Sequence, residues 1–329
     1  MQKYNLALAV GLLCSTANAW ALQAMDDNAL AEQTGQDGIT VALQYADSTI
    51  SFSEAIITDT NGMTNASNKA SLVIAPATYS STQGIRLFRN NSSTTLATAP
   101  IKIQMDADAN TASPVFNAAI SLPSDLERIR INPLSVYLAT GDTSIFTGRK
   151  VDGSTTNTFR TGVTELLRVN GEGIDTVFKS GDPLTINVQL GNTPQGHMFM
   201  FTGGSILCVG NNASCMSTTG ADGANPIELI SSNSSSNSSL KLNFKLSASN
   251  QTTGFRLNGF YGDINADGLT FGKSGATDKV DLVLSNITAG CSSGCQDVNT
   301  FSNLKNGSMG NFGVIGASVT NLKVNVRGL

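Results

Sequence analysis

Acidic and amide side chains at alternating positions are the residues of this chain best suited to hold a cation. Four residues fit D-x-N-x-D-G, the first half of a calcium-binding loop: Asp263, Asn265, Asp267 and Gly268. Oxygen ligands at alternate positions suit a hard cation, and the glycine allows the sharp turn that follows them. The acidic ligand expected at the twelfth position is missing, because Ser274 stands there. The pattern predicts either a calcium site or an Asx-rich turn between two strands. A shorter fragment without the glycine comprises Asp106, Asp108 and Asn110.

A single imidazole limits the catalytic chemistry that the sequence can support. His197 is the only histidine, so a hydrolase that uses a histidine base would have to use this one. No Gly-x-Ser-x-Gly sequence accompanies it, which favours a structural histidine at a strand edge. Asp125 and Glu127 could act as a carboxylate pair in glycoside hydrolysis, but nothing places them in an aromatic-lined cleft. The sequence predicts a protein without enzymatic activity, and it predicts no cofactor apart from the candidate calcium ion.

Four cysteines follow the predicted signal peptide, and their even number in an exported chain indicates disulfide bonds. Three pairings are open, and the spacing favours two local ones, Cys208 with Cys215 and Cys291 with Cys295. Such short loops should fix turns more than they stabilise the whole fold. The C-x-x-x-C spacing could also bind a metal ion, but no histidine or acidic pair flanks it.

The first 21 residues have the features of a secretory signal peptide. Lys3 supplies the positive charge, residues 6–13 form a short apolar stretch, and Ala19-Trp20-Ala21 is the expected cleavage site, with Ala17-Asn18-Ala19 as the alternative. No transmembrane segment is expected in the mature chain. Charged residues make up only 13%, and the net charge is −4, which argues against a nucleic-acid partner. We expect export to the periplasm, the outer surface or an extracellular fibre.

The elements that must position these residues are strands. Apolar and polar residues alternate with a period of two in four clear stretches: residues 101–106, 184–190, 240–246 and 322–327. This alternation predicts strands with one buried and one hydrated face, which favours antiparallel sheets. The fold class expected is therefore all-β, an antiparallel sandwich or a jelly-roll-like fold, with a β-solenoid as the alternative. Residues 122–130 could form one or two helical turns after Pro123.

Serine and asparagine dominate residues 231–239, SSNSSSNSS, and divide the chain. This composition predicts a flexible polar loop or a linker. It would separate a β domain over residues 39–230 from a C-terminal β region over residues 240–329, and we expect the two to pack together.

A short N-terminal motif over residues 22–38 differs from the strand patterns that follow it. Asp26 or Asp27 can cap a helix, and Gly35 suits its end. A helix of so few residues is marginal in water and needs a surface for its apolar side chains, Leu22, Met25 and Leu30. Residues 22–34 are expected to be an assembly segment that docks on a neighbouring subunit or a secretion partner. The alternative is that they dock on this protein's own sheets.

The same motif resembles that of a family of secreted Gram-negative proteins, the FilA family of a pilus system. The shared pattern is L-x-x-M-x-D-x-x-L-x-x-x-T-G-Q-x-G-I, and residues 22–39 fill it. The strand-like residues 48–62 and three later blocks, at 190–205, 257–272 and 306–329, are also similar to the family. The resemblance implies an association with a pilus, and it carries no active-site residues.

Together, the patterns and the resemblance predict a non-enzymatic exported component of a pilus-like or surface assembly, structural or related to adhesion. Its expected partners are other subunits of that assembly. The alternative is a periplasmic or surface module that binds calcium or a glycan, and it rests on residues 263–267.

Overall fold

The computed structural model describes residues 38–327, apart from a set of short gaps. These gaps are 45–48, 61, 63–67, 76–83, 90–94, 109–112, 149–157, 194, 212–214, 216–226, 234–235, 267, 292–298, 302–303 and 306. The predicted signal peptide and residues 22–37 of the N-terminal motif, including Leu22, Met25 and Leu30, therefore lie outside the described residues.

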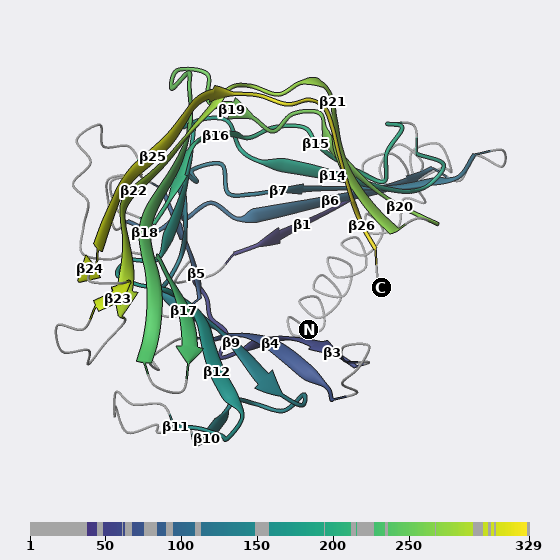
Figure 1. Cartoon of the computed structure of the whole chain (residues 1–329). Helices are drawn as coiled ribbons and strands as arrows, with labels where there is room; N and C mark the ends of the chain where they lie inside the picture. The colour runs from purple at the N-terminus through teal and green to yellow at the C-terminus, as the bar shows by residue number, and fades with distance from the viewer. Residues whose placement is uncertain are drawn as a thin grey trace, which may run out of the picture.

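The first of two large sheets has eight antiparallel strands and lies in the upper right part of Figure 1. In spatial order its strands are β1 (Ile39–Leu43), β6 (Ile101–Asp108), β7 (Val115–Ser121), β14 (Thr185–Gly191), β15 (Phe199–Phe201), β20 (Phe260–Asn265), β21 (Gly268–Ala276) and β26 (Thr320–Val326). We call it the eight-stranded sheet. Strands from both ends of the chain, β1 and β26, form its two edges.

The larger sheet has fourteen strands and runs down the left of Figure 1 to β4 and β3 at the bottom. Its main path is β2 (Thr49–Ile50), β5 (Ile85–Phe88), β8 (Arg128–Ile131), β13 (Ile174–Phe178), β16 (Ser205–Gly210), β18 (Ser236–Ala248), β17 (Ile227–Asn233), β12 (Val163–Val169), β9 (Leu134–Thr140), β4 (Ala70–Ala75) and β3 (Ala55–Asp59). Three further strands join it: β19 (Phe255–Arg256) pairs with β16, and β22 (Val280–Cys291) pairs with β18 and with β25 (Gly307–Ala317). Two small hairpin sheets comprise β10 (Phe146–Gly148) with β11 (Thr158–Phe159), and β23 (Asn299–Phe301) with β24 (Leu304–Lys305).

The all-β class and the antiparallel pairing predicted from the alternation are confirmed. The described strands form two large open sheets and two small hairpin sheets, so the solenoid alternative is wrong. No helix long and apolar enough to cross a membrane occurs among the residues that the structure describes.

Two local expectations are wrong. Residues 122–130 hold one β-turn and no helix. The turn is closed by the Leu126 N–H donating to the Pro123 carbonyl (3.0 Å), and β8 begins at Arg128. The serine-rich stretch is not a linker either, because β17 and β18 continue through it and pair residue by residue up to Asn233 and Ser236. β18 then lies inside the larger sheet, so the C-terminal region shares both sheets with the part of the chain before it.

Two long segments of the chain, β21 with β22 and β25 with β26, each bend and connect the two sheets. The chain leaves β21, bends at residues 277–279 and continues as β22 in the larger sheet; β25 and β26 make the same passage in reverse beside it. Figure 1 shows this ribbon crossing the top of the molecule. The bend is held by the Thr277 N–H donating to the Val319 carbonyl (2.8 Å) and by the Val319 N–H donating to Thr277 Oγ1 (3.0 Å). Asp281 adds a third contact by accepting the Gly316 N–H (2.7 Å).

Alternation gives the eight-stranded sheet one apolar and one polar face. On the apolar face, a single row of paired residues crosses all eight strands: Ile39, Met105, Ala118, Val188, Phe199, Gly262, Phe271 and Val324. We call it the apolar row. The absence of a side chain at Gly262 makes room for the Phe199 ring, since a Cβ there would lie 1.8 Å from its tip. Phe199 packs edge-on against Phe271, with ring centroids 5.6 Å apart.

The apolar faces of the two sheets meet at a corner beside the bend. An apolar cavity of about 250 Å³ lies there, between Val209 and Leu246 of the larger sheet and Phe260 and Leu322 of the eight-stranded sheet. A neighbouring core cluster includes Leu87, Leu126 and Phe178, with the half-buried Leu122 and Leu184 packed against it. We call the edge of the apolar face near this cavity its corner end and the opposite edge its far end.

Candidate functional site

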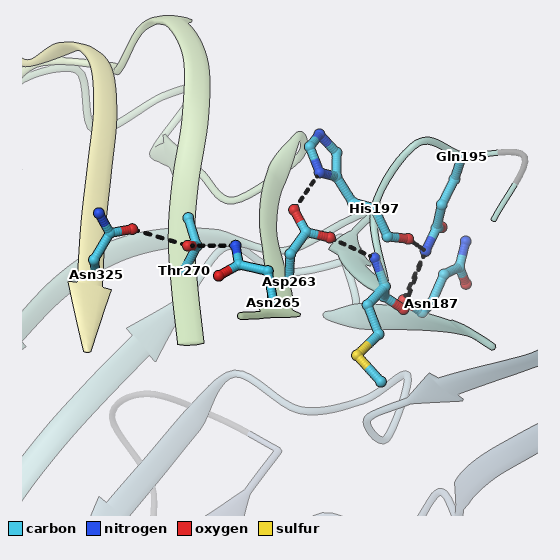
Figure 2. A network of polar contacts seen from close by, with 8 residues as sticks. Asn187, Gln195, His197, Asp263, Asn265, Thr270 and Asn325 are labelled. Carbon is cyan, nitrogen blue, oxygen red and sulfur yellow. Dashed lines mark hydrogen bonds and ion pairs between the residues drawn. The ribbon is translucent and has the colours of Figure 1, made fainter. Parts of the chain in front are cut away.

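The candidate site is a polar cluster on the polar face of the eight-stranded sheet (Figure 2). Its members are Asn187, Gln195, His197, Asp263, Asn265, Thr270 and Asn325. The loop between β14 and β15 carries His197, and β20 carries Asp263. His197 Nδ1 lies 2.8 Å from Asp263 Oδ2, and the Met198 N–H donates to Asp263 Oδ1 at 2.8 Å. One carboxylate therefore holds both the imidazole and the backbone of the loop against β20.

The imidazole is also held from one side by an aromatic ring. Tyr261 stacks on His197, with centroids 3.6 Å apart and planes 11° apart. A Cβ at Gly272 of the next strand would lie 2.5 Å from the Tyr261 ring, so this ring lies over a glycine just as Phe199 does on the other face. Asp263 and His197 keep 30% of their side-chain area exposed. The pair is therefore accessible from solvent.

Gln195 fixes the shape of the loop that presents His197. Its Nε2 donates to the His197 carbonyl (2.6 Å), and its backbone N–H donates to Gln189 Oε1 (3.0 Å) on β14. Gln189 in turn lies 3.3 Å from Asn117 Oδ1 on β7. The loop is thus tied to two strands besides β20.

The polar contacts continue across β21 to the edge strand. Asn265 Nδ2 lies 3.3 Å from Thr270 Oγ1, which donates to Asn325 Oδ1 at 2.8 Å. Thr270 is buried on β21, and its two partners lie on the neighbouring strands β20 and β26. These bonds use polar side chains to join three neighbouring strands (Figure 2).

The chemistry open to this cluster is limited by what surrounds the imidazole. A histidine paired with a carboxylate needs a hydroxyl or thiol on its other nitrogen to activate a nucleophile. In the part of the chain that the structure describes, the His197 ring hydrogen-bonds to Asp263 alone. The arrangement is that of a structural histidine which ties a loop to the sheet.

The residues of the predicted calcium loop lie in a hairpin. Asp263 and Asn265 belong to β20, Gly268 begins β21, and Asp267 lies outside the described residues. Both carboxylate oxygens of Asp263 already accept protein hydrogen bonds. Among the described residues, no group of three or more histidine, cysteine or acidic side chains could hold a metal ion. Calcium binding stays a prediction.

The other acidic candidates lie apart from this cluster. Asp106 and Asp108 are exposed on β6, and Asn110 lies outside the described residues. Asp125 holds a loop by accepting the N–H groups of Thr98 (2.9 Å) and Ala99 (3.2 Å). Burial opposes the charged form of Asp125, but these hydrogen bonds outweigh it and lower its pKa below 3.8. Asp125 therefore acts as a structural anchor for that loop.

The cysteines are placed in part. Cys208 and Cys215 form a disulfide, as the spacing predicted, and both are buried beside Val177 and Leu207. Cys291 ends β22, but Cys295 lies outside the described residues, so their pairing stays a prediction.

Sequence reasoning missed the buried charges of the larger sheet. Arg130 donates to both oxygens of Asp175, at 2.6 and 2.8 Å. Burial disfavours the Arg130 cation, but the bonds to Asp175 outweigh this effect and raise its pKa. Arg128 lies over the Phe88 ring, 4.2 Å from its centroid. The alternation R-I-R-I in β8 was the available signal, but it does not reveal which carboxylate lies opposite.

A sequence model of a family of unknown function, DUF6160, matches residues 1–109, a stretch of 109 of the 329 residues. Neither the curated proteins nor the solved structures gave a match. Among the described strands, the matched region holds β1 to β6. It therefore contains none of the residues of the polar cluster.

Proposed function

We propose that this protein is a non-enzymatic, exported component of a pilus-like or surface assembly, with a structural or adhesion-related role. The observation that carries the proposal is the edge strand β25. It has eleven residues without a charge or a proline, and four large apolar side chains on it are exposed: Met309, Phe312, Val314 and Ile315. Within the described residues it pairs only with β22.

Natural edge strands usually carry protection against pairing with another chain, in the form of charges, prolines or short length. Three of the other edge strands follow this rule, whereas β1 also lacks charges and prolines but has only five residues, fewer than half the length of β25. β26 carries Lys323, β3 ends at Asp59, and β2 has only two residues. β25 differs from them, and an unprotected edge is what strand addition between subunits requires.

Two features of the sequence support the same role. The predicted signal peptide would export the chain. The resemblance of residues 22–39 and of the three later blocks to the FilA family associates it with a pilus system. One of these blocks, 306–329, includes β25 and β26. The alternative of a calcium- or glycan-binding module has less support, because the polar atoms of Asp263 are engaged by His197 and Met198.

The decisive experiment compares two exposed isoleucines on different edge strands. Ile315→Lys places a charge on β25, where the side chain is 84% exposed; Ile57→Lys does the same on β3, where it is 67% exposed. Both variants should be exported and should melt like the native protein. Only Ile315→Lys should be lost from the sheared surface fraction and from multimers seen on sizing. A native protein found solely as a periplasmic monomer would refute the assembly role.

A further inference from the structure

The apolar face of the eight-stranded sheet is unevenly covered. Near its corner end, Phe260 and Leu322 line the cavity beside the larger sheet and are half-buried. Toward its far end the exposed fraction rises to 67% for Ile264 and 53% for Val326. No described residue covers this end, although alternation makes it as apolar as the corner end. A sheet face of this kind normally packs against a second layer.

The chain enters the sheet at this far end. β1 begins at Ile39, which lies in the apolar row and is 64% exposed, and runs toward the corner end, where Leu43 pairs with Ile101. Gly38, just before it, has a φ of +61°, and a Cβ there would lie 2.2 Å from the Met105 carbonyl oxygen. The backbone therefore turns at the edge of the uncovered surface, at a position that admits only glycine.

The residues just before this turn have the chemistry and length to cover the surface. Residues 22–34 include Leu22, Met25 and Leu30, and the sequence predicts a helix that is marginal alone. With Asp26 as the cap, the eight residues 27–34 would form a helix about 12 Å long, and residues 22–25 would precede it. Strands are spaced at about 4.8 Å, so such a helix could lie across about two or three of them.

Tether length decides between this chain and a second copy. Only residues 35–37 separate the segment from Gly38, and three residues span at most about 11 Å. Such a short connection keeps the segment beside its own sheet at an effective concentration on the order of millimolar. Free copies of the protein would have to match this concentration to compete.

We propose that residues 22–34 dock on the far end of the apolar face of their own eight-stranded sheet and complete its second layer. Leu30 of the helix, with Leu22 and Met25 just before it, would face the apolar row, and Glu32, on the opposite side of the helix from Leu30, would remain hydrated. This inference selects the intramolecular alternative for the segment. It is independent of the assembly role, which rests on β25.

The first test locates the segment by photo-crosslinking in the mature, exported protein. Benzoylphenylalanine at position 30 should react within one chain, give a monomer band on denaturing gels and yield peptides from β6, β7 or β14. The same probe in place of Glu32 is the matched control and should give few links to these strands. Links that join two chains, or the absence of links to the sheet, would overturn the proposal.

The second test uses the surface itself. Ile39→Ser should lower the melting temperature of the full chain by several degrees, because the segment would pack against this side chain. The same substitution should have no effect once residues 22–34 are deleted behind an intact signal peptide. Thr40→Ser, on the polar face of the same strand, should be neutral in both chains. An equal effect of Ile39→Ser in both chains would show that the segment lies elsewhere.

Discussion

The two faces of the eight-stranded sheet come from the same strands but reach stability in different ways. On the polar face, His197, Asp263 and Thr270 find partners on neighbouring strands, so the face is satisfied within the sheet. On the apolar face, Phe199 and Phe271 contact each other, yet Ile264 at the far end remains mostly exposed. Hydrogen bonds can be completed within one layer, whereas removal of apolar area from water needs a second one.

The largest effect should come from disturbing the apolar row. Gly262→Ala places a Cβ 1.8 Å from the Phe199 ring, so the ring must shift and its edge-on contact with Phe271 is disturbed. We expect the free energy of unfolding to fall by about 3 kcal/mol, the upper end for overpacking, in chemical denaturation. Gly313→Ala is the matched control, since its nearest neighbouring heavy atom would lie 3.6 Å away. A loss below that of the control would show that the row is loosely packed.

A smaller effect is expected on the polar face. Asp263→Ala removes the acceptor for both the His197 ring and the Met198 N–H, and we expect a loss of about 1 kcal/mol because the site is partly hydrated. Asp263→Asn keeps one acceptor oxygen for the Met198 N–H and should lose less. Urea denaturation of the two variants measures the difference. Equal losses would mean that the charge, and not the loop contact, matters.

Acid should weaken the bend where the two sheets meet. The Ser249 hydroxyl and the Gly316 N–H both donate to Asp281 and lower its pKa below 3.8. A carboxyl group with a lowered pKa stabilises the folded state above its ordinary value and loses this contribution as pH falls through the lower one. The melting temperature should therefore fall more steeply below pH 3.8 in the native protein than in Asp281→Asn. Parallel pH profiles would exclude the contribution of Asp281.

The smallest effect is expected from chelation. Both oxygens of Asp263 accept hydrogen bonds from the protein, so removal of divalent ions should leave the melting temperature unchanged. Calorimetry with and without a chelator measures this directly. A decrease that disappears in Asp263→Ala would instead establish the calcium site that the D-x-N-x-D-G motif suggests.

Alternation carried most of what the sequence could predict about the fold. It located β6, β14, β18 and β26, because apolar and polar residues take turns along each of them. It could not extend β17 and β18 through the serine-rich stretch, because no apolar side chain in that sequence marks a face, although the backbone pairing continues there. It also could not show that Val326 lies at an end that no described residue covers, since exposure depends on the second layer and not on the strand.

The candidate site was predictable only in its parts. His197 was expected to be structural, and Asp263 was expected to bind calcium or to belong to an Asx-rich turn, but the two are 66 positions apart in the sequence. They meet because β15 lies beside β20, a pairing that local patterns do not specify. The Cys208–Cys215 disulfide was easier to predict, because a separation of seven residues limits the choice of partner.

The two bent segments, β21 with β22 and β25 with β26, also determine how the protein should unfold. β21 continues into β22, and β25 into β26, so each of these segments is hydrogen-bonded in both sheets. Because the Thr277 N–H donates to the Val319 carbonyl at the bend, unfolding of one sheet would disturb the backbone of the other. The eight-stranded and larger sheets should therefore lose their structure in one cooperative transition. Hydrogen exchange should show the slowest amides of both sheets opening with the same free energy.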